Sequence, residues 1–136
     1  MNIVIDANVL FSALIKDSTT RRIILEHDGF FLFPSYIFIE MEKHKDELLK
    51  KSRMSEEDFG KLLRMILKRV VIIPNEVLIP HKREAYKIVK DIDPDDTLFF
   101  ACALAHSNSI IWSDDKKLKK QNKIRVYLTE EIIRII

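Results

Sequence analysis

Acidic side chains are the groups in this sequence whose types and spacing best suit chemistry. Five of them lie where apolar segments end or predicted helices begin: Asp6, Glu40, Asp96, Asp114 and Asp115. Carboxylates gathered at one place repel one another, which raises their pKa values unless a counter-charge is present. Mg²⁺ or Mn²⁺ removes this penalty, because these hard cations prefer oxygen ligands. Such ions lower the pKa of bound water and stabilise displacement at phosphorus, so metal-dependent phosphodiester hydrolysis is the expected chemistry.

Each acid also has a purely structural interpretation. Asp6 can cap a helix that directly follows it, because Asp side chains accept hydrogen bonds from the free N–H groups of a first turn. Asp93, Pro94 and Asp96 form a favourable helix start, in which the helix dipole stabilises the acids. The adjacent acids after residue 113 can cap the next helix, and Glu40 can lie on a solvated helix face. Only their predicted convergence at one place favours a functional role.

The composition removes several other kinds of site. The chain has 136 residues and a net charge of +2, with 47% hydrophobic and 32% charged residues, which predicts one folded domain over residues 1–136. Its two glycines, Gly29 and Gly60, cannot form a glycine-rich phosphate loop. The single cysteine, Cys102, excludes an intramolecular disulfide and a Cys₄ or Cys₂His₂ zinc site, and we expect it in the core. Carboxylates are therefore the reactive groups that remain.

The elements that must position the acids alternate between strands and helices. Apolar segments predict strands at residues 2–6, 30–33, 70–73, 109–112 and 125–128. Helical spacing and capping patterns predict helices at residues 7–15, 19–27, 34–51, 55–69, 82–90, 93–105 and 116–120, and a last helix from residue 129. Strands separated by helices favour a parallel sheet covered on both faces. Ligands bind beyond the carboxyl ends of such strands, and the acids are predicted to meet there.

The sequence also bears on the location of the protein. No window approaches the roughly 18 consecutive apolar residues that a membrane span needs. The apolar start of the chain has no basic leader and is interrupted by an Asp. A single cysteine suits a reducing compartment. We therefore expect a cytoplasmic protein that makes no membrane contact.

Four segments of the chain resemble the motifs of the PIN-domain family, in the order in which the family has them. Residues 1–10 (MNIVIDANVL) are similar to its opening strand and Asp, and residues 34–45 (PSYIFIEMEKHK) to its second acidic motif. Residues 95–103 (DDTLFFACA) are similar to its third motif, and residues 110–118 (IIWSDDKKL) to its fourth, a strand followed by Ser or Thr and then Asp. The resemblance implies a three-layer α/β/α sandwich with a five-stranded parallel sheet of order 3-2-1-4-5.

The resemblance also implies roles for individual residues and partners. The metal ligands and catalytic acids would be the residues that match the acidic motifs: Asp6, Glu40, Asp96 and Asp115. Asp114 is a further candidate ligand or a helix cap, while Asn8 and Ser113 would support the ligands as polar neighbours. The cofactor would be Mg²⁺ or Mn²⁺, the substrate RNA, and the molecule a homodimer. Small members include VapC-type toxins, which an antitoxin peptide neutralises, but the doubled acids of residues 95–96 and 114–115 depart from a typical toxin.

A basic stretch follows the fourth acidic motif. Its lysines suit contacts with the backbone of RNA entering a metal site: Lys116, Lys117, Lys119 and Lys120. A solvated, lysine-rich surface explains the same residues equally well. Trp112 offers a face on which a base can stack, but its place in an apolar strand favours packing in the core.

Three classes of function are compatible with these residues. The leading hypothesis is a Mg²⁺- or Mn²⁺-dependent endoribonuclease, with the toxin of a toxin–antitoxin pair as one implied role. The alternative is a PIN-like module that binds RNA or protein without cutting, which the retained acids disfavour. A phosphoaspartyl hydrolase usually has a second Asp two residues after its nucleophile, where this chain has Asn8. A receiver domain needs a phosphorylatable Asp at the end of a central strand with a late Lys beside it, and no predicted strand offers a clear match.

Overall fold

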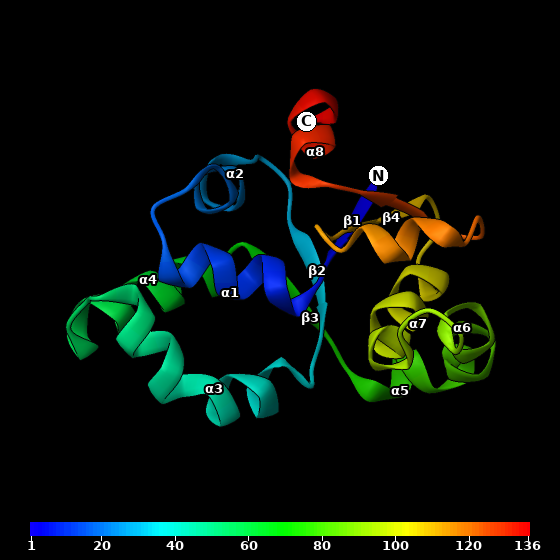
Figure 1. Cartoon of the computed structure of the whole chain (residues 1–136), viewed down its shortest axis with the longest axis horizontal. Helices are drawn as coiled ribbons and strands as arrows, with labels where there is room; N and C mark the ends of the chain where they lie inside the picture. Colours follow the sequence, from blue (N-terminus) through cyan, green and yellow to red (C-terminus); the bar gives the residue numbers. More distant parts are fainter.

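A five-stranded, fully parallel sheet forms the centre of the computed structural model, which describes residues 1–136 (Figure 1). Its strands are β1 (Asn2–Ile5), β2 (Phe31–Pro34), β3 (Val70–Ile73), β4 (Ser109–Trp112) and β5 (Arg125–Tyr127). Their order is β3-β2-β1-β4-β5, which confirms the 3-2-1-4-5 order and the α/β class expected from the resemblance. The order reverses between β1 and β4, and a binding site is expected beyond the carboxyl ends of these two strands.

Helices cover both faces of the sheet (Figure 1). One layer contains α1 (Ala7–Ile15), α2 (Thr19–Glu26), α3 (Ile37–Ser52) and α4 (Glu56–Leu67). The other contains α5 (Asn75–Leu78), the 3₁₀ turn η1 (Ile79–His81), α6 (Lys82–Val89), the 3₁₀ turn η2 (Pro94–Asp96) and α7 (Thr97–Ala105). The 3₁₀ turn η3 (Lys116–Lys120) joins β4 to β5, and α8 (Thr129–Ile135) ends the chain. None of these helices is both long enough and apolar enough to cross a lipid bilayer.

The central strands are apolar on both sides because both faces are covered. Val4 pairs with Leu32 of β2 and with Ile111 of β4, and all three side chains are buried. Such continuous apolar runs, without polar alternation, are typical of parallel strands between two helical layers. This packing fixes the strand ends, and with them the starting points of the loops that carry the acids.

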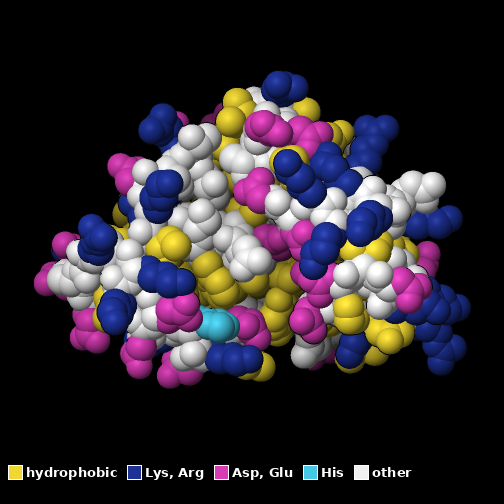
Figure 2. Space-filling view, in the orientation of Figure 1, with side chains coloured by type: hydrophobic (Ala, Val, Ile, Leu, Met, Phe, Trp, Pro, Cys, Tyr) yellow, Lys and Arg dark blue, Asp and Glu magenta, His cyan; other side chains and the backbone are white.

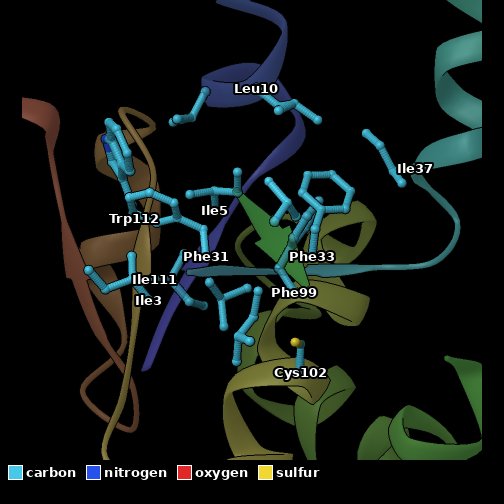
Figure 3. Close-up of a cluster of buried hydrophobic side chains, with 14 of the residues drawn as sticks. Ile3, Ile5, Leu10, Phe31, Phe33, Ile37, Phe99, Cys102, Ile111 and Trp112 are labelled. Carbon is cyan, nitrogen blue, oxygen red and sulfur yellow. The ribbon is translucent and has the colours of Figure 1, made fainter. Parts of the chain in front are cut away.

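Aromatic side chains pack among aliphatic ones in the core (Figure 3). Phe31 and Trp112 are fully buried, and their ring centroids lie 5.6 Å apart. Phe33 meets Phe99 of α7 edge to face, at a centroid distance of 5.4 Å. Cys102 is also fully buried, and burial raises the pKa of its thiol to about 12. The expectation that Trp112 and Cys102 belong to the core is therefore confirmed.

Several element boundaries differ from the sequence-based prediction, among them the ends of β1 and β5, which each stop one residue earlier than predicted. The second strand begins at Phe31 rather than Phe30, whose side chain is 58% exposed, and it continues through Pro34. The short helix α5 was not predicted, because its four residues are too few to show a helical period. The helix predicted at 93–105 begins with the 3₁₀ turn η2, and the basic helix at 116–120 is itself a 3₁₀ helix. Short 3₁₀ turns are common at the ends of α-helices, as at η2, and as connectors, as at η3.

Candidate metal centre

Asp6 lies at the carboxyl end of β1, beside the end of β4. Its backbone N–H donates to the carbonyl of Trp112 at 3.2 Å, so the sheet itself fixes its position. The carboxylate is only 4% exposed, and its Oδ1 accepts a hydrogen bond from the N–H of Val9 at 2.8 Å. Asp6 therefore does cap α1, as the structural interpretation predicted. The remaining carboxylate oxygen takes no part in that cap.

Three further carboxylates converge near this strand end. Oxygens of Asp93, Asp96 and Asp115 lie within 4.8 Å of one another, and each residue is half-buried. Asp93 caps η2, Asp96 is the last residue of η2 and precedes α7, and Asp115 caps η3, so two separate chain turns deliver these groups. The sequence had assigned Asp93 only to capping. Its spacing of three residues from Asp96, one helical turn, is the signal that indicates a shared face.

The electrostatics of this group show the repulsion expected of crowded acids. Burial, followed by the charges of Asp93, Asp6 and Asp115, raises the pKa of Asp96 to about 7. Burial also raises the pKa of Asp6 to about 6, against the opposing effect of hydrogen bonds from Ser113 and Val9. Because the charge of Asp6 acts on Asp96, and the charge of Asp115 acts on both, these three acids belong to one electrostatic cluster.

A lysine ammonium already lies against this cluster. The Nζ of Lys117 is 3.5 Å from Oδ2 of Asp93 and 3.6 Å from Oδ2 of Asp115. These charges raise the pKa of the Lys117 side chain. The donor set consists of carboxylate oxygens, which hard divalent cations prefer, and the ammonium marks the place where a positive charge is favourable. The residues present therefore fit a divalent metal ion.

Glu40 lies on the same side of the sheet, in the first turn of α3, but outside the group of three converging carboxylates. Its Oε2 is 3.4 Å from Nε2 of His44, one turn further along the helix. Burial, then the charges of Glu40, Asp96 and Asp6, raises the pKa of Tyr36. The Tyr36 phenol is thus within electrostatic range of Glu40 and of the other acids. The sequence predicted no role for Tyr36 or His44, and only their spacing of four residues on either side of Glu40 could have indicated that they lie near it.

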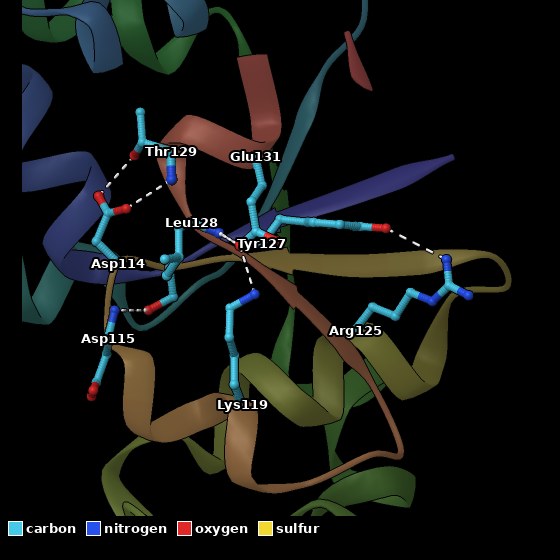
Figure 4. A network of polar contacts seen from close by, with 9 residues as sticks. Asp114, Asp115, Lys119, Arg125, Tyr127, Leu128, Thr129 and Glu131 are labelled. Atoms are coloured by element: carbon cyan, nitrogen blue, oxygen red, sulfur yellow. Dashed lines mark hydrogen bonds and ion pairs between the residues drawn. The ribbon is translucent and has the colours of Figure 1, made fainter. Parts of the chain in front are cut away.

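Asp114 points away from the converging carboxylates and binds the start of α8 (Figure 4). Its Oδ1 accepts a hydrogen bond from the N–H of Thr129 at 2.8 Å, and its Oδ2 accepts one from the Thr129 hydroxyl at 2.7 Å. The indole N–H of Trp112 donates to the same hydroxyl at 2.9 Å. Both oxygens of Asp114 are thus engaged in holding α8 to the end of β4, whereas the predicted cap of the helix directly after β4 is provided by Asp115.

The two predicted polar neighbours have different surroundings. Ser113 is fully buried, its hydroxyl accepts a hydrogen bond from the N–H of Asp115 at 3.1 Å, and hydrogen bonding to Asp6 lowers the pKa of that acid (Figure 4). Asn8 is exposed and lines a groove between α1 and α3 with Phe11 and His44. It makes no hydrogen bond to any of the acids, so only Ser113 contacts the candidate ligands directly.

The basic stretch is divided between ion pairs and free cations. Lys117 contacts the acids, and the Nζ of Lys119 is 2.6 Å from Oε1 of Glu131 (Figure 4). Lys116 and Lys120 form no ion pair, and Lys120 lines an open groove of about 590 Å³ together with six other charged or amide-bearing residues. Figure 2 shows acidic side chains near the middle of one face, with Lys and Arg side chains beside them over the η3 region.

The fold and this site define an α/β protein with a carboxylate cluster at the topological switch point of a parallel sheet. A family model described as "PIN domain" matches residues 4–129 of the 136, and the chain belongs to the PIN-domain family. A comparison with curated proteins finds no match. PIN domains are generally nucleases, which are hydrolases, and usually use a divalent metal ion.

Proposed function

We propose that this protein is a Mg²⁺- or Mn²⁺-dependent endoribonuclease. The observation that carries the proposal is the convergence of Asp93, Asp96 and Asp115 within 4.8 Å beside the buried Asp6, at the switch point of a PIN-type sheet. Asp6, Asp96 and Asp115 are the proposed ligands, and Asp93 joins them because its oxygen lies within the same radius. The metal would supply a bound water of lowered pKa and stabilise the charge that develops on the phosphate.

Glu40 is the least constrained member of the proposed ligand set. It lies 3.4 Å from His44 and outside the group of converging carboxylates, and its charge raises the pKa of Tyr36. We propose that Glu40 orients a metal-bound water or a second ion from the α3 side. Ser113 is proposed to hold Asp6 and the Asp115 backbone in position, a role that its complete burial supports. Asp114 is proposed to act in α8 attachment and not as a ligand.

The proposed RNA path runs along the lysines next to the cluster. Lys116 and Lys120 form no ion pair, and the groove beside η3 adds Lys87 of α6 and Lys123 of the following loop. Contacts of this kind neutralise phosphates without reading sequence. We propose that these four lysines, more than Lys117 and Lys119, bind the RNA backbone.

A homodimer is the proposed assembly. Phe38 and Ile39 on α3 are 56% and 69% exposed, and Ile79 of η1 is 62% exposed. Burial of such apolar surface favours association. Replacement of Phe38 and Ile39 by Ser is expected to turn a dimer into a monomer in light scattering after size exclusion, and a monomeric parent protein would refute this assembly. Neutralisation by an antitoxin peptide stays a prediction from the family resemblance.

An RNA cleavage assay tests the activity. The parent protein is expected to cut RNA with Mn²⁺ and to lose this activity in EDTA, and Asp6→Asn is expected to keep the fold and lose cleavage. Asp46→Asn provides the matched control, because Asp46 is exposed on α3 and forms no ion pair. Full activity of a pure Asp6→Asn protein would overturn the proposal. Salt-sensitive RNA binding without cleavage by the parent protein would favour a non-cleaving binding module.

A further inference from the structure

Lys117 contacts the carboxylates of the proposed metal site through both its ammonium group and its backbone N–H. Its Nζ lies 3.5 Å from Asp93 and 3.6 Å from Asp115, and in both cases the contact is with Oδ2. Its backbone N–H donates to the other oxygen, Oδ1, of Asp115 at 3.1 Å. Lys117 therefore contacts both oxygens of a carboxylate that is a proposed metal ligand.

The backbone of Lys117 is fixed while its side chain is free to leave. The next residue, Leu118, is 1% exposed, and its N–H donates to the Asp115 carbonyl at 3.1 Å, so η3 is anchored in place. The Lys117 side chain, in contrast, is 53% exposed. Movement of its ammonium into water thus requires only side-chain rotation.

A metal ion held by this cluster would use carboxylate oxygens of the same residues, Asp93 and Asp115, that the ammonium contacts. Two cations cannot share Oδ2 of Asp93 and Oδ2 of Asp115 at contact distance without strong mutual repulsion. We propose that Lys117 is a resident counter-cation that competes with the divalent metal for Asp93 and Asp115 and thereby sets the metal affinity of the site. The inference rests on the proposed function, because it concerns the same carboxylates.

If Lys117 competes with the metal, its removal should raise the affinity for Mn²⁺. If Lys117 instead supported the ligands, its removal should lower that affinity. Removal of the ammonium leaves the carboxylates without a counter-charge, so Lys117→Met should bind Mn²⁺ about three- to tenfold more tightly, as expected for the loss of two partly exposed ion pairs. A residue that holds the ligands in place would instead weaken binding when removed. Lys117→Arg keeps the charge and should bind Mn²⁺ within about twofold of the parent protein.

The test is titration of Mn²⁺ into the metal-free protein of residues 1–136. Calorimetry and the electron paramagnetic resonance signal of free Mn²⁺ both measure the binding affinity. Lys116→Met is the matched control: it makes the same change in charge one residue away, where no ion pair exists. A lower melting temperature of Lys117→Met in EDTA, with a larger Mn²⁺-induced rise than in the parent protein, supports the same conclusion.

The outcomes separate the inference from the proposed function. Unchanged or weaker Mn²⁺ binding by Lys117→Met, in a background where the parent protein cleaves RNA, overturns the inference alone. An equal gain in affinity for Lys116→Met also overturns it, because the effect would then be a general change in net charge. No Mn²⁺ binding by any variant, together with no cleavage, overturns both the proposed function and the inference.

Discussion

Replacement of Asp6 by Asn is expected to stabilise the metal-free protein above pH 6 although it removes a proposed metal ligand. Asn keeps an oxygen that can accept the hydrogen bond from Val9, so the cap of α1 is preserved. Burial raises the pKa of Asp6 from 3.8 to about 6, and this difference of about two units corresponds to roughly 3 kcal/mol of lost stability in the ionised state. Because Asn cannot ionise, we expect the variant to be more stable by about 1 to 3 kcal/mol at pH 8.

The pH dependence of this effect has a definite sign. Between pH 4 and pH 6 the folded protein holds a proton on Asp6 that the unfolded chain has released, so the stability of the parent protein falls as the pH rises. Below pH 4 the carboxyl is protonated in both states, and Asp6 and Asn should then be nearly equivalent. Urea unfolding of both proteins in EDTA, at about pH 4 and pH 8, measures the difference.

Addition of Mn²⁺ should reverse the order of stability at pH 8. A ligand that binds only the folded state stabilises it by about 2.7 kcal/mol at a concentration of 100 times its Kd. The parent protein should gain this stabilisation, whereas Asp6→Asn should gain much less. An Asp6→Asn protein that is less stable than the parent in EDTA at pH 8 would refute the electrostatic reasoning, and an equal Mn²⁺ response would refute the role of Asp6 as a ligand.

Three further predictions concern the surroundings of the site. Asp114→Ala should lower the stability to urea by about 1 kcal/mol, because Thr129 loses its acceptor, and should leave the Mn²⁺ affinity in calorimetry unchanged; a loss of Mn²⁺ affinity would instead make it a ligand. Lys120→Ala and Lys123→Ala should weaken RNA binding in fluorescence anisotropy and each reduce the slope against salt by about one, and an unchanged slope would exclude phosphate contacts. Cys102, whose pKa is raised to about 12 by burial, should react with a thiol reagent only as fast as the protein unfolds, whereas fast labelling of the native protein would contradict its burial.

Most of the fold could be predicted from the sequence because its strands are short, apolar and separated by helices with clear caps. Ser55, for example, accepts a hydrogen bond from the N–H of Asp58 at 3.1 Å, as the capping pattern indicates. The strand order came from the family resemblance, since apolar runs alone do not say which strands are neighbours. The boundary at Phe30 was wrong because an aromatic residue suits a strand equally well whether it lies inside or just before the sheet.

The candidate site was only partly predictable for a similar reason. Asp6 and Asp115 follow directly from strand ends, which meet at one edge of a parallel sheet. Asp93 and Lys117, in contrast, reach the cluster from a 3₁₀ turn and from a long flexible side chain. Sequence patterns indicate which helix, strand or turn a residue belongs to, but they do not indicate where such a side chain points. The same limit applies to Asp114, whose turn toward Thr129 depends on where α8 begins.

The most direct test of the proposed metal site is a crystal structure from crystals grown with Mn²⁺, with anomalous scattering recorded at the manganese edge. We expect an anomalous peak within coordination distance of carboxylate oxygens of Asp96 and Asp115, next to Asp6, with the Lys117 ammonium displaced from its present contacts. A protein that cleaves RNA with Mn²⁺ but shows no manganese at these carboxylates would contradict this expectation.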